Sequence, residues 1–375
     1  MFNTSLAKIV LHKRNFLYNL QSLSIIRFIA TDSITIHKKS FMISYLINSC
    51  GLSQQKAISI SKKFHFESPT NPDSVLTLFR NNGFSESQIS KIIATSPRLL
   101  VSSADKTLKP KFDFFSSKGL SGDDLAKVLG WEATVLHSSL ENTIIPVFDS
   151  LKRIFQTDEK VITVLKRSMD VLTTYKIIES NIALLQSHGV PMSNIGKLLV
   201  SQPRVFLRNP SGFSEKVEEV KKMKCDPSQY TFLVAIRALF QMSKSTLESK
   251  FGVYKSWGWS EDEVRYAFRK NPYCMMLSKE NIMLKMDSFV NKFGYAPSSI
   301  AKQPFVLQYS CEKRIIPRCS TMQILLKNGK VEQSTTLFSF LQMQEKVFLK
   351  KYISRFEKEV PELLCAYQGK GKMNG

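Results

Sequence analysis

One short turn recurs along this 375-residue chain at nearly regular intervals. It consists of a glycine, an apolar residue and, in most copies, a serine. Two gaps of double length are filled in phase by Phe155 and Met223. Successive anchors lie 32 to 36 residues apart, and a period of this length over most of a chain is typical of a solenoid of stacked repeats. The glycine copies begin at Gly51, Gly83, Gly119, Gly189, Gly258 and Gly294.

The segment from 83 to 97 illustrates the pattern that each turn introduces. Ser85 can cap a helix N-terminus, and Gln88 lies three residues later, as a capping box requires. Isoleucines at positions 89, 92 and 93 then form one apolar helical face. Pro97 cannot continue a regular helix, so it ends the segment. Each turn therefore predicts a short amphipathic helix and then a break.

The proline break lies at a constant distance from the turn in some repeats only. Proline stands fourteen residues after the turn glycine in three repeats, and Pro304 comes four residues earlier in the last one. A second amphipathic helix fills the space between repeats, and no strand-type alternation is sustained. The chain thus predicts an all-α array of about eight helical pairs. The in-phase prolines are Pro97, Pro203 and Pro272, whereas other repeats carry Ala133, Met169 and Arg237 at this place.

Domain boundaries can be drawn from these patterns. We expect an organellar transit peptide at residues 1–40, the helical repeat array at residues 41–330, and a C-terminal helical cap and tail at residues 331–375. Within the cap, Leu337 to Phe356 predicts one longer amphipathic helix.

The net charge of the chain restricts the kinds of partner it can bind. Lys and Arg number 53 against 31 Asp and Glu, which gives a formal net charge of +22. Such an imbalance favours an anionic partner, either nucleic acid or a membrane surface. No apolar run reaches the ~18 residues needed to cross a bilayer, and we expect no membrane partner.

Residues that could carry chemistry are scattered. The six cysteines form no Cys-x-x-Cys pair, so we expect buried free thiols in a reducing compartment. The five histidines show no metal-ligand spacing, and no glycine-rich phosphate loop is present. We therefore expect no metal, no cofactor and no enzymatic activity.

The first forty residues resemble an import signal. They carry six Lys and Arg against a single acid, Asp32, with frequent Ser and interleaved apolar residues. A basic, acid-poor amphipathic start predicts an organellar transit peptide recognised by the import machinery. The bulky apolar residues favour the mitochondrion, with the chloroplast as the alternative.

Basic residues gather at fixed places in the repeats. Positions 8, 11 and 12 after each turn anchor lie opposite the apolar face of the helix. Across eight repeats these 24 positions hold ten basic residues and no acidic one. A charged outer face alone would explain charge but not one sign. We call these ten residues the cationic row: Lys62, Lys63, Lys91, Lys127, Lys166, Arg167, Lys197, Arg269, Lys270 and Lys302.

Stacked repeats would align these cations into a groove that tracks a polyanion, with phosphate contacts rather than base contacts. Arg98 and Arg204, just after the breaks, are further candidates for nucleic-acid binding. The acids fall elsewhere, in the first turns of the helices, where the helix dipole favours them.

Several phrases resemble the mitochondrial transcription termination factor (mTERF) family, in its plant branch, over roughly residues 42–345. The resemblance implies an organelle-imported α-solenoid of helix-helix-3₁₀ repeats that binds nucleic acid on a concave basic face. It implies roles in organellar transcription or termination on double-stranded DNA, with RNA-directed intron splicing or ribosome assembly as the alternative. The phrases are Gly83–Ser85 with Pro97–Leu100, Leu108–Phe112, Gly119–Leu129, Trp257–Pro272, Lys285–Asp287 and Glu312–Cys319.

One alternative belongs to another class, a helical-repeat scaffold for protein partners. Its exposed surface should be mixed in sign and rich in aromatic residues. In either case we expect a monomer.

Overall fold

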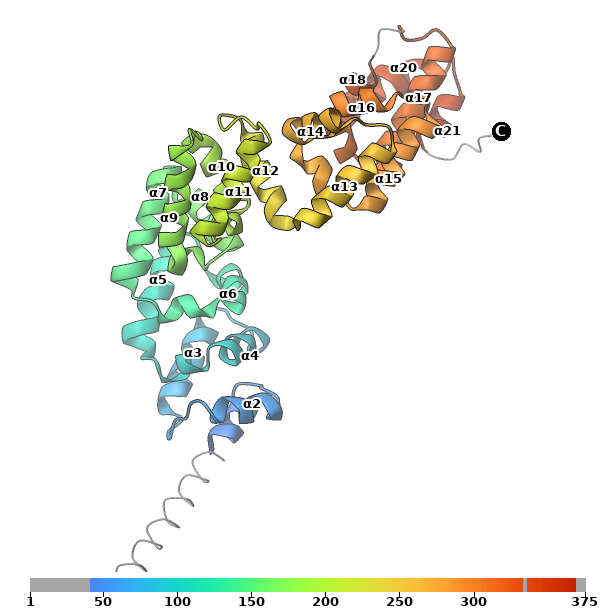
Figure 1. The fold of residues 1–375 in the computed structure, drawn as a ribbon. Coiled ribbons are helices and arrows are strands. Elements are labelled where there is room, and N and C mark those ends of the chain that lie inside the picture. Colours follow the sequence, from blue (N-terminus) through green and yellow to red (C-terminus); the bar gives the residue numbers. More distant parts are fainter. Residues whose placement is uncertain (1–40, 333–335, 369–375) are drawn as a thin grey trace, which may run out of the picture. The chain divides into compact units, whose positions relative to one another are not determined.

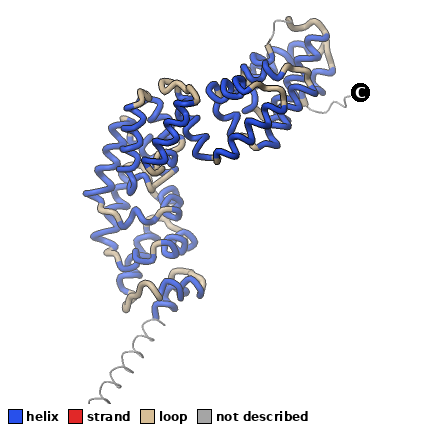
Figure 2. Tube along the Cα trace, viewed as in Figure 1, coloured by secondary structure: helices blue, strands red, loops and turns tan. Residues whose placement is uncertain are grey.

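A computed structural model of the chain describes residues 41–332 and 336–368 (Figure 1). No strand occurs in these residues, and helices are joined by short turns (Figure 2). The all-α prediction is therefore confirmed for the described part of the chain. The expected transit peptide at residues 1–40 and the tail after residue 368 lie outside the described residues.

Two kinds of helix alternate along the chain. A turn helix comes directly after each recurring turn, and a linking helix leads from one repeat to the next turn. Residues 41–48 are also helical. The turn helices are α2 (Gln54–Ser61), α4 (Glu86–Thr95), α6 (Gly122–Trp131), α8 (Asp158–Arg167), α10 (Met192–Ser201), α12 (Tyr230–Gln241), α14 (Glu261–Lys270) and α16 (Pro297–Lys302). The linking helices are α3 (Thr70–Asn81), α5 (Lys109–Ser117), α7 (Ile145–Phe155), α9 (Val171–Ser187), α11 (Pro210–Lys222), α13 (Lys244–Ser256), α15 (Lys279–Asp287) and α17 (Ile316–Lys327).

The chain divides into two compact units, residues 1–175 (unit 1) and 176–375 (unit 2). The division falls inside α9, beside Thr174, whose φ of −117° and ψ of 16° are not helical. In unit 1 the linking helices α3, α5 and α7 run along one side and the turn helices α4, α6 and α8 along the other (Figure 1). Helix α4 packs on α6, and α6 packs on α8. Equivalent positions of these turn helices therefore lie side by side.

The recurring turn has one backbone signature. All six turn glycines have positive φ, between 67° at Gly51 and 90° at Gly258. In the two repeats without glycine, Gln156 and Lys224 take this left-handed conformation, with φ of 64° and 59°. These are the only non-glycine residues with positive φ in the described part of the chain. The period is thus confirmed, although the true anchors there lie one residue after the predicted Phe155 and Met223.

Lys224→Gly is expected to stabilise the protein by roughly 1 kcal/mol. A Cβ atom in the left-handed region costs ~1–2 kcal/mol, and the greater freedom of glycine in the unfolded chain offsets part of the gain. Urea unfolding measures the change. The matched control is Lys222→Gly at the end of α11, which should lower stability by up to about 1 kcal/mol. A loss of stability in both variants would contradict the strain argument.

Proline explains most of the breaks. The 3₁₀ helices after α4, α10, α14 and α16 all begin at a proline, which keeps the preceding residue out of the α conformation. Ser96, for example, has φ of −132° and ψ of 62°. These helices are η1 (Pro97–Val101), η5 (Pro203–Val205), η6 (Pro272–Met276) and η8 (Pro304–Gln308).

The three repeats without the in-phase proline behave differently from one another. Ala133 still begins a 3₁₀ helix, η3 (Ala133–His137). Met169 lies in a plain turn before α9, and Arg237 lies inside α12, so these two repeats lack the 3₁₀ break. The 3₁₀ break is therefore a property of most repeats and not of every one.

A buried polar side chain on the linking helix fastens the end of most breaks. Asn181 Nδ2 donates to the carbonyls of Phe206 and Arg208, at 3.0 and 2.8 Å. Such carbonyls would otherwise lack a partner where the helical hydrogen bonding stops. Asn71, which is exposed, makes the same kind of pair, to the carbonyls of Leu100 and Ser102. In three further repeats a lysine Nζ is the donor, from Lys111, Lys250 and Lys285 to the carbonyls of Leu136, Met275 and Leu307.

The C-terminal region corrects one prediction. The expected single helix from Leu337 to Phe356 is wrong, because the chain leaves the helical conformation at Met343 and Gln344. Arg318, only 1% exposed, donates from Nη1 to the carbonyls of Phe340, Leu341 and Met343 and from Nη2 to Glu345. The resulting helices are α18 (Leu337–Gln342), α19 (Glu345–Phe348), α20 (Ser354–Phe356) and α21 (Glu362–Tyr367).

Candidate nucleic-acid interface

The turn helices position the cationic row. Helices α4, α6, α8, α10 and α14 each have ten residues, and their last turn holds positions 11 and 12 of the repeat. A helix C-terminus favours cations, so the dipole accounts for part of the pattern. Position 8 lies one turn earlier. The row therefore runs along the C-terminal halves of neighbouring turn helices, beside the breaks.

Unit 1 brings several row members together. Because α4 packs on α6 and α6 on α8, Lys91 and Lys127 lie at equivalent places on adjacent helices. Lys166 and Arg167 end α8 next to them, and all four side chains are exposed. The first repeat adds Lys62 and Lys63 after α2, both exposed.

Two members of the row pair with acids. Lys127 Nζ lies 2.7 Å from Asp123 Oδ2, and Lys166 Nζ lies 2.5 Å from Asp124 Oδ2. The hydrogen bond between Lys127 and Asp123 raises the pKa of the lysine and lowers that of the carboxyl. Acids in the first turn of α6 thus reach cations that the sequence suggested would be separate. The pairs are exposed, so they are weak and can exchange for a phosphate.

Unit 2 holds the remaining row members. Helices α10, α12, α14 and α16 pack in chain order. Lys197, Lys270 and Lys302 are exposed, whereas Arg269 is half-buried. Helix α12 carries no cation at the row positions, and its Val234 is buried there. The row of unit 2 is therefore interrupted at α12.

The two additional arginines lie in the 3₁₀ breaks. Arg98 is the second residue of η1, and Arg204 is the second residue of η5. Both side chains are exposed. No ion pair is formed by either arginine, or by Lys91 and Lys197, within residues 41–332 and 336–368. These cations are thus available to an external anion.

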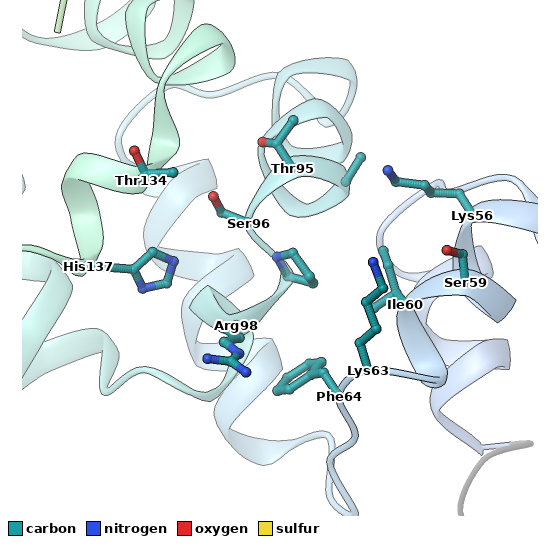
Figure 3. Close-up of a pocket in the computed structure, with 12 residues that line it drawn as sticks. Lys56, Ser59, Ile60, Lys63, Phe64, Thr95, Ser96, Arg98, Thr134 and His137 are labelled. Atoms are coloured by element: carbon teal, nitrogen blue, oxygen red, sulfur yellow. The ribbon is translucent and has the colours of Figure 1, made fainter. Parts of the chain in front are cut away.

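A cavity in unit 1 gathers polar side chains from three repeats, with cations from the first two. It has a volume of about 410 Å³ and lies between α2, the end of α4 with η1, and η3. In Figure 3, Lys56 approaches it from α2 and Lys63 from the turn after α2, His137 faces it from η3, and Arg98 lies between them. Phe64 supplies part of an apolar wall. Converging cations around a partly apolar hollow suit an anionic ligand with a flat apolar part.

The surroundings of His137 in this cavity change the pKa of its imidazole. Burial, together with the smaller effect of the positive charges of Lys111 and Arg98, lowers its pKa below the ordinary histidine value. The lowered pKa favours the neutral form of the imidazole.

Sequence reasoning missed two groups of residues. Lys56 and His137 of the cavity lie outside the positions that the row uses. Lys111, Lys250 and Lys285 count toward the positive charge, yet they are buried, and burial lowers the pKa of each. The sequence feature that could have identified these three lysines is a polar residue eight or nine positions before the next turn glycine.

Other kinds of site find little support. No cluster of three or more His, Cys, Asp or Glu residues that could hold a metal occurs among the residues that the structure describes. Over the same residues, no helix is both long and apolar enough for a bilayer span. Five of the six cysteines are buried as expected, but Cys365 is exposed, which corrects that expectation for one thiol.

Comparison with known proteins fits this geometry. A family model described as mTERF matches residues 76–236 and 215–349, which together span more than half of the chain. No curated protein matches the sequence of this chain. The helical-repeat proteins of this family bind nucleic acid and are not enzymes, so the match supports nucleic-acid binding in an organelle at the family level. The chain belongs to the mTERF family.

Proposed function

We propose that this protein is an organellar regulatory factor that binds double-stranded DNA through its phosphate backbone and acts in organellar transcription or its termination. The observation that carries the proposal is the single-sign cationic row on adjacent turn helices. Cations such as Lys91 and Lys127 stand on helices that pack side by side. Family membership supports nucleic-acid binding in general, and the choice of duplex DNA belongs to the proposal.

The chemistry of the row favours backbone contacts. Eight of its ten members are lysines. Lysine is a point charge without the forked geometry that fits a guanine edge, so it suits phosphates more than bases. Arg98, Arg204 and Arg269 have the fork, and any sequence preference would come from them. An RNA ligand in splicing or ribosome assembly is the alternative within the same class.

Salt dependence tests the proposal. If six to eight cations contact a duplex, the slope of log affinity against log salt should be about −5 to −7. Fluorescence anisotropy with the full chain and a labelled duplex measures it. A protein-binding scaffold would give a weak signal with a shallow slope, which would contradict the proposal. Crosslinking and sequencing in purified organelles then distinguishes DNA from RNA.

Import into the mitochondrion is part of the proposal. It is motivated by the six basic residues and one acid of residues 1–40. Residues 1–40 fused to a fluorescent reporter should direct it into mitochondria. Deleting residues 2–30 from the whole protein should abolish organellar accumulation. Accumulation that persists after the deletion would refute the import signal, and accumulation in chloroplasts would correct the compartment.

A further inference from the structure

The cavity in unit 1 differs from the rest of the candidate interface, because it is a hollow and not an open surface. Its volume of about 410 Å³ falls within the range of about 300–1,000 Å³ that is usual for small-molecule sites. Of the described residues that line it, Lys56, Lys63 and Arg98 are cations, and none is acidic. A hollow of this size suits a small anion better than a rigid duplex, which can only lie across its mouth.

The three cations of the cavity are not neutralised by neighbouring acids. Lys56, Lys63 and Arg98 form no ion pair within residues 41–332 and 336–368. Lys127 and Lys166 of the cationic row, by contrast, both pair with acids of α6. Positive charges that share one hollow repel one another, so an anion that enters it relieves this repulsion.

Ser96 gives a second, independent indication of a ligand. It separates α4 from η1, lines the cavity and is only 4% exposed. In the part of the chain that the structure describes, its hydroxyl forms no hydrogen bond. A nearly buried hydroxyl without a partner is costly unless a ligand or a water satisfies it. Figure 3 shows Ser96 on the same side of the cavity as Arg98, with Lys56 and Lys63 on the other side.

The charge of the cavity favours a phosphate monoester. Near pH 7 a monoester carries about −1.5 to −2 charges and three strong acceptor oxygens. A carboxylate or a backbone phosphodiester carries only one negative charge and leaves more of the positive charge unbalanced. Arg98 can donate two parallel hydrogen bonds to such a group, and the lysines add point charges. Ile60, Phe64 and Pro97 form an apolar wall for the less polar remainder of the ligand.

We propose that this cavity binds the phosphate monoester of a small molecule, such as a nucleoside monophosphate. Lys56, Lys63 and Arg98 hold the phosphate group, and the hydroxyl of Ser96 donates to it. Because Lys63 and Arg98 are also candidates for nucleic-acid binding, the bound monoester competes with nucleic acid. The competition rests on the proposed function, whereas binding of the monoester does not. The phosphorylated 5′ end of a strand carries the same group, and the experiment distinguishes the two sources.

Calorimetric titration of the full chain at constant ionic strength compares adenosine 5′-monophosphate (AMP), inorganic phosphate and adenosine. AMP should bind at least about tenfold more tightly than adenosine, which lacks the charged group. Inorganic phosphate should bind more weakly than AMP, because it makes no contact with the apolar wall. Arg98→Met should weaken AMP binding about 10- to 150-fold, as expected for lost hydrogen bonds to a charged group.

Ser96→Ala tests the hydroxyl separately. The variant should weaken AMP binding about 2- to 12-fold, the effect of one neutral hydrogen-bond donor. Thermal unfolding of the free protein should stay the same, because the hydroxyl has no partner to lose. A change in thermal unfolding without a change in AMP affinity would show that Ser96 has only a structural role.

The matched control removes an arginine from the same unit. Arg153 is exposed on α7 and does not line the cavity. Arg153→Met should leave AMP binding unchanged. If it weakens AMP binding as much as Arg98→Met does, bulk positive charge attracts the ligand and the proposed site is wrong. Adenosine that binds as tightly as AMP would overturn the proposal as well.

Anisotropy titrations with duplex measure the competition. Saturating AMP should weaken duplex binding by the wild type and flatten its salt slope by about 1 to 2, because Lys63 and Arg98 are then occupied. Duplex binding that does not respond to bound AMP would refute the competition. A duplex with a 5′-phosphate is compared with the same duplex ending in a 5′-hydroxyl. Tighter binding of the phosphorylated duplex, reversed by AMP, assigns the site to a strand end, and equal binding assigns it to the free small molecule.

The two proposals can fail separately. If AMP binds through Arg98 but no nucleic acid shows a salt-dependent affinity, the proposed function fails and the monoester site stands. If duplex binds with a steep salt slope but neither AMP nor inorganic phosphate binds, the monoester site is overturned and the proposed function stands.

Discussion

Replacing Lys91, Lys127 and Lys197 together by Gln is expected to weaken duplex binding roughly 500-fold at 0.1 M salt. Three lost phosphate contacts should flatten the salt slope by roughly 3, and this difference accumulates between 1 M and 0.1 M salt. All duplex sequences should weaken alike, because lysine reads charge and not base identity. Anisotropy titrations at several salt concentrations measure both the affinity and the slope.

The matched control removes the same charge elsewhere. Lys346, Lys350 and Lys351 are exposed residues of the C-terminal region, in α19 and in the π-helix η10 (Leu349–Ile353) that follows it. Their triple Gln variant should retain nearly the wild-type slope. If it weakens binding as much as the first variant, bulk charge and not the cationic row attracts the nucleic acid. Since Lys127 pairs with Asp123, adding Asp123→Asn to the first triple variant shows whether the freed carboxylate contributes to the loss.

Arg318→Met should destabilise unit 2 by about 3–5 kcal/mol. The guanidinium is buried and satisfies three carbonyls at the end of α18, besides Glu345. It also lies over the ring of Phe348, 4.2 Å from the centroid. Methionine fills a similar volume but leaves these acceptors without a donor, and the desolvation of each is then uncompensated.

Hydrogen exchange localises the effect. In Arg318→Met, the amides of α18 and α19 should exchange much faster than in the wild type, and thermal unfolding should begin earlier. Arg355→Met, an exposed arginine of α20, is the control and should change stability by less than about 0.5 kcal/mol. Unchanged protection of α18 in Arg318→Met would show that the guanidinium does not hold this region.

Much of the fold could be predicted because its determinants are local. The turn needs a residue that tolerates positive φ, and glycine provides it at Gly83 and the other anchors. The cap of α4 needs Ser85 and Gln88 at a fixed spacing, and the structure forms this capping box. Such signals depend on a few neighbouring residues, so they can be read directly from the sequence.

The cationic row was predictable only as a pattern. Spacing identified Lys91 and Lys127 on the outer face, and both are exposed. It could not show that Asp124 pairs with the row, because Lys166 reaches Asp124 from another repeat. Nucleic-acid binding by the row stays a prediction, and the triple Gln variants test it.

The sequence by itself determined the period, the helical class and the outer position of most cations, since these depend on the turn and on helical geometry. Only the tertiary structure decided which cations point inward. From the sequence alone, Lys285 and Arg318 would be expected on the surface. In the structure each donates a hydrogen bond to a backbone carbonyl more than twenty residues away. A long-range partner of that kind has no local signature, because the carbonyl that accepts the bond belongs to every residue type.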